Sequence, residues 1–492
     1  MSVTSSQVPE LMKLGEIPTN LAQDVTTDIL DPVVFSQTFC RFTLERKGFL
    51  HSFSRLTLAL DKLTNASNQN ATYPANIGVH SLIERATLKV GAQTICEIED
   101  FNKYMAYKSM FIQNDINAER ESVLTGRIMN HGFTYTDATD VLTNNFNATG
   151  YHLDNGTNTL GDHSDDITPK GAEWLPTAST SASFEYAGVQ VNDNLLLHNE
   201  PVLQIALSDL FPFLRFNQLP LYMMDEQVSI ELVFANKTSD DRFTFGSGAS
   251  STENADITQG AVQMVADYIF YDGETMRQYS EANSNMTWNY IDYRLTKRSY
   301  SAGPSASQTQ QILNVGGAGR IVNKLIVGMF DDSASDVSVL GPFGSYSASL
   351  MTNNVGQITT NVRYNDHYLY PIDRTLSAIQ FHDVVQTENN IAYVTRDEYN
   401  QEGGGQTHAG GISATNFNGL AIDNDTIGLR GKFNWQAHRL NRNERISSRG
   451  IELETLYSGL LTPIADSYTQ RVWIEIVRSA TLINGMVNCY YA

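Results

Sequence analysis

Four aspartates and two histidines lie close together in the sequence, and their side chains are possible ligands for a metal ion. They are His152, Asp154, Asp162, His163, Asp165 and Asp166. Calcium binds carboxylate oxygens of this kind. The spacing does not match the calcium loop of an EF-hand, however, and an acidic segment without such a pattern is more often a solvated surface loop. We therefore predict a solvated loop here, with calcium binding as the alternative.

A second segment, Gly428-Leu-Arg-Gly431-Lys432-Phe433, is similar to part of a phosphate-binding loop. That motif requires a leading glycine and, directly after the lysine, a hydroxyl that binds magnesium. The leading glycine is absent, and Phe433 stands where the hydroxyl is needed. A turn next to a strand is therefore the better interpretation. The glycines at 403–405 and 410–411 likewise indicate a flexible loop.

Other motifs of catalysis and metal binding are missing from the sequence. It contains no His-x-His pair, no His-Glu-x-x-His and no Gly-x-Ser-x-Gly. The three cysteines, Cys40, Cys96 and Cys489, are scattered in apolar surroundings and indicate neither a disulfide framework nor a zinc site. We predict that the chain is not an enzyme and has no catalytic, cofactor-binding or metal-binding residues and no cofactor.

The composition limits the classes of protein that fit this chain. Its 492 residues exceed what one hydrophobic core usually serves, so we expect two domains. The net charge is -21, with 54 acidic and 33 basic residues, and Lys13 is the only basic residue in the first 36. Direct binding of nucleic acid is therefore not expected. We find no apolar run long enough to span a membrane and no secretory signal in residues 1–16, and we expect folding in a reducing compartment.

The first half of the chain has the pattern of antiparallel strands. Cys40, Phe42 and Leu44 alternate with polar residues, and a further strand is expected at residues 50–60. Residues 77–98 indicate two strands separated at Gly91. A helix is expected at residues 100–111, and a short helix or turn is expected around residues 208–216. A strand follows in which Val228, Ile230, Leu232 and Phe234 alternate with polar residues.

The middle of the chain looks like the end of one domain and the start of another. Residues 262–271 are apolar and predict a strand buried on both faces, and residues 274–281 predict a short helix or turn. Strands of the second half are expected at residues 288–296, 310–315, 320–330 and 357–370, with a closing hairpin at 471–477 and 486–491. We interpret 1–35 as an irregular arm, 36–272 and 288–492 as two β-sandwich domains, and 273–287 as their linker.

Long loops rich in small polar residues separate these strands. Residues 136–194 are rich in Asn, Thr, Gly, Ser and Asp, and Lys170 is the only Lys or Arg between Arg127 and Arg215. A loop of this length is usually functional or exposed at a working surface. We predict an acidic surface of loops that faces solvent. Trp288, Tyr290 and Trp473 are interpreted as packing residues in or between the sandwiches rather than as a platform that stacks on sugars.

Four segments together resemble the double jelly-roll major capsid proteins of Polinton-like viruses, virophages and large nucleocytoplasmic DNA viruses. Residues 76–112 carry a Gly-x-x-Ser-Leu motif, two strands separated by a glycine, and an aromatic helix. Its positions are Gly78, Ser81, Leu82, Gly91, Phe101, Tyr104 and Tyr107. Residues 206–234 and 267–272 are similar to later parts of the first jelly roll. Residues 471–492 resemble the last hairpin of the second.

The resemblance implies an all-β fold of two tandem eight-stranded antiparallel jelly rolls with short helices and long surface loops. It implies a structural protein of a double-stranded DNA virus, assembled inside the host cell, whose homotrimers form pseudo-hexagonal capsomers of an icosahedral virion. The partners would be neighbouring copies and, through the N-terminal arm and inner face, minor capsid or penton proteins. Contact of the arm with an internal membrane is the alternative, and the sequence leaves it open.

Two other functions remain open at this stage. The same sandwiches with long loops would suit a receptor-binding or glycan-binding spike, and a carbohydrate-active enzyme uses paired carboxylates that one sequence does not reveal. Seven sequons are also present, at Asn65, Asn70, Asn147, Asn155, Asn236, Asn285 and Asn424. Because Asn and Thr are frequent and no signal peptide is recognised, we attribute most of these sequons to chance. Glycosylation by a virus-encoded system is the alternative.

Overall fold

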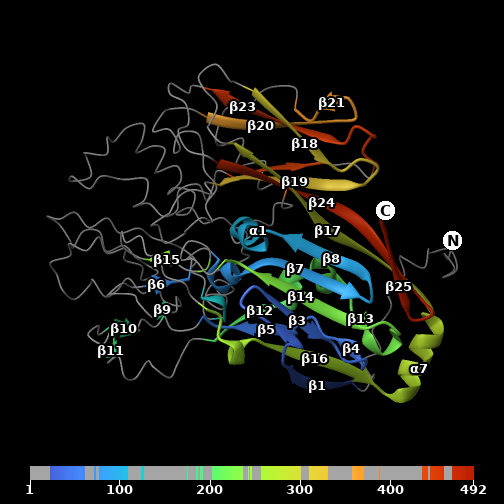
Figure 1. Cartoon of the computed structure of the whole chain (residues 1–492). Helices are drawn as coiled ribbons and strands as arrows, with labels where there is room; N and C mark the ends of the chain where they lie inside the picture. The colour runs from blue at the N-terminus through green and yellow to red at the C-terminus, as the bar shows by residue number, and fades with distance from the viewer. Residues whose placement is uncertain are drawn as a thin grey trace, which may run out of the picture.

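The fold was analysed in a computed structural model of the whole chain (Figure 1). The residues that the structure describes are 23–60, 71–73, 77–108, 124–126, 174–175, 184–186, 189–191, 202–236, 242, 244–245, 256–300, 310–330, 357–370, 387, 435–440, 444–458 and 468–491. Within this part of the chain every pairing between named strands is antiparallel. None of the described helices is both long and apolar enough to cross a membrane.

Two sheets form the first half of the molecule. The first contains, in the order in which its strands pair, β12 (Leu203–Ala206), β5 (Arg55–Leu58), β16 (Gln263–Tyr271), β4 (Phe49–Leu50) and β13 (Leu219–Pro220), with β1 (Gln23–Leu30) also paired to β16. The second contains β2 (Val34–Phe35), β3 (Phe39–Thr43), β14 (Val228–Phe234), β7 (Ile83–Val90) and β8 (Gln93–Glu99). Short strands lie at β6 (Ala71–Thr72), β9 (Trp174–Leu175), β10 (Phe184–Tyr186), β11 (Val189–Val191) and β15 (Thr244–Phe245).

Two further sheets form the second half. One contains β17 (Asn285–Tyr300), β24 (Tyr468–Ile483), β19 (Val322–Phe330) and β22 (Gln436–Arg439), with β25 (Met486–Tyr491) paired to β24. The other contains β18 (Gln310–Gly316), β23 (Ile451–Ser458), β20 (Gln357–Tyr364) and β21 (His367–Tyr368). In Figure 1 the sheets lie one above another, with β17 and β25 next to β8.

Short helices lie between the strands of the first half and at the boundary between the halves. They are α1 (Phe101–Lys108), α4 (Leu207–Leu210), α5 (Pro212–Phe216), α7 (Gly273–Ala282) and the 3₁₀ turns η3 (Gly78–Leu82), η4 (Leu221–Met223) and η5 (Gln259–Ala261). The helices expected near 100–111, 208–216 and 274–281 are therefore confirmed. Asp272 caps α7 through a hydrogen bond that its side chain accepts from Thr275 N.

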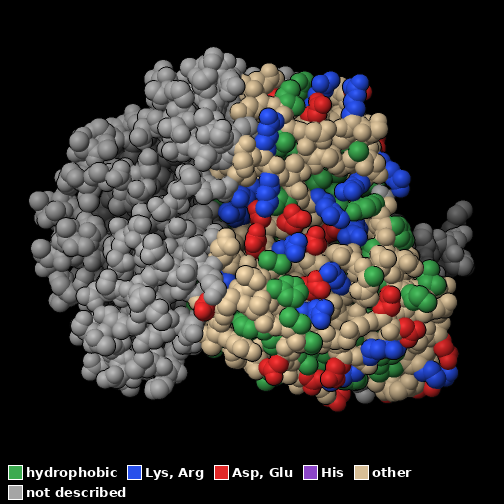
Figure 2. Space-filling model, in the orientation of Figure 1, with side chains coloured by type: hydrophobic (Ala, Val, Ile, Leu, Met, Phe, Trp, Pro, Cys, Tyr) green, Lys and Arg blue, Asp and Glu red, His purple; other side chains and the backbone are tan. Residues whose placement is uncertain are grey.

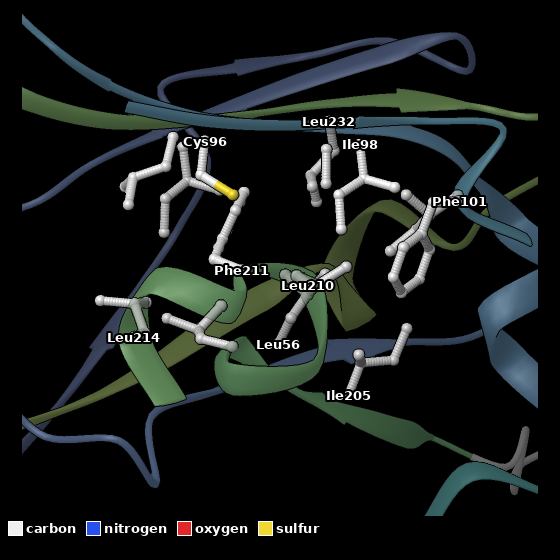
Figure 3. Close-up of a cluster of buried hydrophobic side chains, with 14 of the residues drawn as sticks. Leu56, Cys96, Ile98, Phe101, Ile205, Leu210, Phe211, Leu214 and Leu232 are labelled. Carbon is white, nitrogen blue, oxygen red and sulfur yellow. The ribbon is translucent and has the colours of Figure 1, made fainter. Parts of the chain in front are cut away.

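The hydrophobic core follows directly from the alternation of residue types. In β14, Val228, Ile230, Leu232 and Phe234 are buried and the residues between them are half-buried, as predicted. Figure 3 shows Leu232 of this strand facing α4 and α5, together with side chains from both sheets of the first half. A second, smaller cluster fills the space between the two sheets of the second half. Each half is thus a sandwich with its own buried layer.

The strand at residues 262–271 is less buried than the sequence predicts. We expected burial on both faces, but in β16 buried residues alternate with half-buried ones from Gln263 to Tyr268. One face of β16 packs into the core of the first half, and the other is only partly covered. The apolar run thus predicted the strand correctly and overestimated its burial, because a period-two pattern with few charges looks continuous in sequence.

Part of the N-terminal segment is a strand, contrary to the prediction. Residues 1–35 were expected to be an irregular arm, but β1 pairs with β16 along its whole length, from Gln23 opposite Tyr271 to Leu30 opposite Met264. Lys47 forms an ion pair with Asp28 and holds the strand further. The pattern was missed because β1 is an edge strand with few buried positions, so its sequence lacks a clear alternation. Residues 1–22 lie outside the described residues.

Two predicted strands are each interrupted by a turn. Residues 50–60 divide into β4 and β5, because Ser54 N donates to His51 O and closes a turn between them. Residues 357–370 form a hairpin, since Asn365 and Asp366 adopt positive φ angles of 47° and 64°. Such angles at both central residues close a two-residue hairpin, and Asn and Asp tolerate them best. The long loop predicted at 136–194 contains β9, β10 and β11; its other residues lie outside the described part of the chain.

Basic and acidic side chains lie next to one another on the face seen in Figure 2, and neither sign covers an extended area there. Many of these charges form exposed pairs, such as Arg277 with Glu274 and Glu281 on α7. Pairs of this kind contribute little to stability, typically 0 to about 1 kcal/mol each. Buried charges therefore matter more for the fold than these exposed pairs.

Candidate functional site: the junction between the two halves

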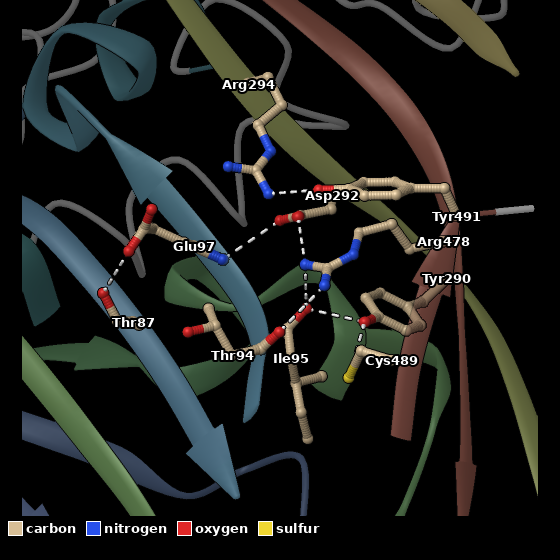
Figure 4. A network of polar contacts seen from close by, with 10 residues as sticks. All are labelled: Thr87, Thr94, Ile95, Glu97, Tyr290, Asp292, Arg294, Arg478, Cys489 and Tyr491. Carbon is tan, nitrogen blue, oxygen red and sulfur yellow. Dashed lines mark hydrogen bonds and ion pairs between the residues drawn. The ribbon is translucent and has the colours of Figure 1, made fainter. Parts of the chain in front are cut away.

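The strand β8 is where the two halves of the molecule meet. Among the described strands it pairs with β7 on one side only, so the backbone groups of its other edge need partners. A buried N–H or C=O group without a partner costs about as much as a lost hydrogen bond. Strands β17 and β25 of the second half pack against this edge. Their sheet does not continue the backbone ladder, and side chains supply the hydrogen bonds instead (Figure 4).

The centre of the β8 edge is capped by a tyrosine and an arginine. Tyr290 Oη of β17 donates to Ile95 O at 2.8 Å. Arg478 of β24 donates from Nη1 to the same oxygen at 2.9 Å and from Nη2 to Thr94 O at 3.1 Å. Two consecutive carbonyls of β8 are thus bound by one planar guanidinium, whose donors have a fixed geometry.

Two further backbone groups of the β8 edge are bound by side chains in the same way. Glu97 N donates to Asp292 Oδ1 of β17 at 3.1 Å, and Trp473 Nε1 of β24 donates to Glu99 O at 3.1 Å. Every one of these bonds joins the first half to the second. The junction is therefore held in one register by side chains whose donors and acceptors match the backbone of β8.

A buried ion pair lies at the centre of this arrangement. Arg478 Nη1 donates to Asp292 Oδ2 at 2.8 Å, and the two residues are 6% and 0% exposed. Burial raises the pKa of Asp292, and the charge of Arg478 opposes this effect. A buried pair is strongly destabilised when only one partner is removed, because the other charge is left without compensation. The pair therefore fixes how the two halves are positioned. It adds less to the free energy that holds them together.

A second buried carboxylate, Asp100, joins β8 and α1 to the second half. Its Oδ2 accepts from Arg471 Nε at 2.7 Å, and its Oδ1 lies 2.6 Å from Lys297 Nζ. Asp100 has a φ of 48°, and its carbonyl accepts from Tyr104 N at the start of α1. Burial acts to raise the pKa of Asp100, but Arg471 and Lys297 outweigh it, and the pKa is lowered.

Aromatic rings fill the space between the polar contacts. Phe213 of α5 packs edge-on against Trp288 and Tyr290, with ring centroids 5.7 and 5.1 Å apart. The ring centroid of Tyr104 in α1 lies 4.8 Å from that of Tyr293. Trp473 is fully buried. The buried apolar cluster of the first half therefore continues into the second. The interpretation of Trp288, Tyr290 and Trp473 as packing residues is confirmed.

The last hairpin extends the junction along the molecule. The turn between β24 and β25 is formed by Asn484 and Gly485, whose φ angles are 50° and 80°. Gly485 O accepts from Asp225 N at 2.8 Å, and Val487 N donates to Glu226 Oε2 at 3.3 Å. The final strands of the second half are thus bound to a loop of the first half.

The buried cysteines of the first half do not provide reactive thiols. Burial raises the pKa of Cys40 to about 12 and raises the pKa of Cys96 well above its usual value, so neither thiol is a ready nucleophile. Across the described ranges there is no group of three or more His, Cys, Asp or Glu residues placed to hold a metal ion. All three cysteines are free thiols.

The structure does not describe most of the candidate site residues from the sequence. The acidic segment with Asp154 and Asp166, the segment at Gly428–Phe433, the glycines at 403–405 and 410–411, and the sequons at Asn65, Asn70, Asn147, Asn155 and Asn424 lie outside the described residues. Asn236 and Asn285 are described, and both are exposed. None of the described candidates belongs to the junction.

The charged residues of the junction were not recognised from the sequence. One signal was present: Asp292 follows Trp288 and Tyr290 at the same alternate positions of its strand. A charge on the buried face of a strand usually has a partner. No signal identified that partner as Arg478, because it lies 186 residues further along the chain.

Replacing Asp100 with asparagine is expected to lower the free energy of unfolding by about 2 kcal/mol at pH 7, because Arg471 and Lys297 lose their carboxylate. The folded-state pKa of Asp100 is lowered, so its contribution is complete above the unfolded value of about 4 and is lost as the pH falls through the folded value. The difference between the two proteins should therefore shrink below about pH 4. Guanidinium unfolding at pH 7, 5, 4 and 3 measures it.

The matched control for this experiment is Asp366→Asn. Asp366 pairs with Arg449 at 2.6 Å, but their side chains are 68% and 71% exposed, so a change of less than about 1 kcal/mol is expected. A difference between Asp100→Asn and the unsubstituted protein that stays constant down to pH 3 would contradict the proposed charge coupling.

Comparison with known proteins shows which proteins share this architecture. A family model described as the major capsid protein N-terminus matches residues 18–272. The comparison with curated proteins found no match. Among solved structures, the chain is similar to one titled as a quasi-atomic model of the PBCV-1 virus capsid, with 11% identity and a TM-score of 0.52, covering 96% of this chain and 97% of the other. It is also similar to the Sputnik virophage structure, with 12% identity, a TM-score of 0.52 and coverage of 100% and 93%.

Proposed function

The chain belongs to the major capsid protein family, and from this membership we propose that its copies associate as trimers that tile an icosahedral shell. Its fold is the double jelly roll shared with the PBCV-1 and Sputnik capsid structures. The protein is a structural component of the virion capsid. The formation of trimers is the proposal. The observation that supports it is the junction at β8.

The junction supports the proposal because it makes two sandwiches into one rigid unit. Six such sandwiches from three copies approximate a hexagon only if each copy holds its own two sandwiches at a fixed angle. The Asp292–Arg478 pair, the Trp473 bond and the aromatic contacts tie the halves at several separated points. A closed ring of identical copies requires every contact to repeat with the same geometry. A rigid junction meets that requirement.

We further propose the division of the chain into a first jelly roll at residues 36–272, a linker at 273–287 and a second jelly roll at 288–492. Strand pairing supports it: among the described strands, each pair lies wholly within 23–271 or wholly within 285–491. Two boundaries shift. The N-terminal arm is shorter, because β1 and β2 already belong to the sheets of the first half, and the linker ends before Asn285, where β17 begins.

The partners proposed for the chain are other copies of itself and, through residues 1–22 and the inner face, minor capsid or penton proteins. Direct contact with nucleic acid is not proposed, because the net charge of -21 opposes association with phosphates. We also propose that the protein has no enzymatic activity. The junction supports this, since its buried polar groups bind one another and the backbone of β8.

Sedimentation of the purified chain tests the proposed function. A capsid protein is expected to form a trimer of about 160 kDa, three times the chain mass of 54.7 kDa, and to assemble further into shells or sheets visible by negative-stain microscopy. A glycan-binding spike would remain a discrete oligomer and bind a glycan. A persistent monomer, or hydrolysis of a glycan that depends on a pair of carboxylates, would contradict the proposal.

Removal of residues 1–22 forms a second arm of this experiment. Because the truncation ends before β1, trimers are expected to persist while shell formation fails. Removal of residues 1–35 serves as the comparison, since it also deletes the strand that pairs with β16 and should destabilise the first half. Loss of trimers after the shorter truncation would contradict the proposed role of this segment.

A further inference from the structure

Three arginines gather around Tyr491 at the outer end of the junction. Arg294 Nη2 donates to Tyr491 Oη at 2.8 Å. The guanidinium carbon of Arg320 lies 4.1 Å from the centre of the Tyr491 ring, and that of Arg478 lies 5.2 Å from it. Figure 4 shows Arg294 and Tyr491 on one side of the Asp292–Arg478 pair. The tyrosine ring thus holds the guanidinium groups in a fixed arrangement.

A single described carboxylate, Asp292, interacts with both Arg478 and Arg294 in this group of three cations. Arg478 is paired with Asp292, whereas Arg294 and Arg320 form no ion pair with any carboxylate in the part of the chain that the structure describes. Arg294 Nε is buried and lacks a hydrogen-bond partner among the described residues. A guanidinium has five donors, and burial of one without a partner is costly. Two of these guanidinium groups thus share the Asp292 carboxylate, and Arg320 has no described carboxylate of its own.

The site is open to a ligand from outside the chain. Tyr491 is 38% exposed, and Arg294 and Arg320 are half-buried. Guanidinium groups that are partly desolvated and held against an aromatic ring are well suited to bind a carboxylate, because their planar donors match its two oxygens. Partial burial also makes such a pair stronger than one between fully exposed side chains.

The charge of the chain indicates where that carboxylate comes from. Acidic residues outnumber basic ones by 54 to 33, so copies of this protein repel one another unless local attraction compensates. We propose that Arg294 and Arg320, positioned by Tyr491, form a site that binds an Asp or Glu side chain of a second copy of the chain. This inference rests on the proposed self-association and adds to it a specific attractive contact.

Self-association of the full-length chain tests the inference. Substitution of both arginines, Arg294→Gln with Arg320→Gln, is expected to weaken association about tenfold at low salt and to reduce its dependence on salt concentration. Sedimentation equilibrium at 50 and 300 mM NaCl measures both quantities. Thermal unfolding of the variant verifies that the fold is retained.

The matched control is Arg85→Gln on β7. Arg85 is exposed and, like the two site residues, forms no ion pair with a carboxylate in the described ranges, so its loss changes the net charge without touching the site. Little change in association is expected. Equal weakening by Arg85→Gln and by a single site substitution would overturn the inference, because general charge repulsion would then explain both.

A binding experiment keeps the inference testable even if the purified chain does not associate. A hexa-aspartate peptide serves as the probe, followed by the fluorescence of a dye on the peptide. The unsubstituted protein should bind it in the millimolar range, and the double variant should bind at least about tenfold more weakly. Equal binding to both proteins, or no binding to either, overturns the inference. Failure of the unsubstituted chain to form trimers would instead contradict the proposed function.

Discussion

Replacing Arg478 with methionine is expected to lower the free energy of unfolding by about 3–5 kcal/mol, the largest effect we expect from a single charged residue. The substitution leaves Asp292 buried without its counter-ion, and such isolated charges carry a penalty of this size. It also removes the donors that bind Thr94 O and Ile95 O of β8. Guanidinium unfolding followed by tryptophan fluorescence measures the change, since Trp288 and Trp473 lie at the junction.

Two comparison variants make this experiment specific. Arg46→Met removes an ion pair with Asp225 whose side chains are 53% and 64% exposed, and less than about 1 kcal/mol is expected. Asp292→Leu combined with Arg478→Met removes both charges, so part of the lost stability should return. Recovery should be incomplete, because the backbone groups of β8 remain without partners. Equal effects of Arg478→Met and Arg46→Met would contradict the importance of burial at this pair.

Replacing Trp473 with alanine is expected to lower the free energy of unfolding by a similar amount, about 3–5 kcal/mol. Trp473 is fully buried among Tyr104, Phe330 and Trp435, so truncation leaves a cavity that the surrounding sheets and helix fill only partly. The substitution also removes the hydrogen bond to Glu99 O. Chemical unfolding measured by circular dichroism avoids relying on the fluorescence that the substitution removes.

The two parts of the Trp473 effect are separable. Trp473→Phe keeps most of the ring but not the donor, and a loss of about 1–2 kcal/mol is expected for the unpaired carbonyl and the smaller side chain. Phe53→Ala serves as the surface control, since Phe53 is 72% exposed and its loss should change stability by less than about 0.5 kcal/mol. A Trp473→Ala effect no larger than that of Phe53→Ala would show that Trp473 does not hold the halves together.

The junction also has a consequence for assembly. An open strand edge such as that of β8 is a template on which a strand of another molecule can pair. Here Asp292, Tyr290, Trp473 and Arg478 occupy the hydrogen-bonding groups of this edge. A capsid protein is present at high local concentration during assembly, so covered edges direct its contacts to other surfaces. The buried polar side chains thus contribute specificity as well as a fixed docking angle.

The sequence by itself determined the class of fold and the principal elements of each half. The alternation in β14, the glycine between β7 and β8, the helix after Asp100 and the closing hairpin are local patterns, and local backbone geometry produces them. The family resemblance was likewise visible in these segments. Interruptions within strands, as at Asn365 and Asp366, were missed, because one or two turn residues barely change a hydrophobic pattern.

Only the tertiary structure decided how the halves are joined. Asp292 meets Arg478, and Trp473 meets the carbonyl of Glu99, across 186 and 374 residues of chain. The edge position of β1, and with it the limit of the N-terminal arm, also depends on β16 far along the chain. Which strand edge remains free, and which distant side chain reaches it, is set by the packing of four sheets, and no short-range pattern in a sequence records that packing.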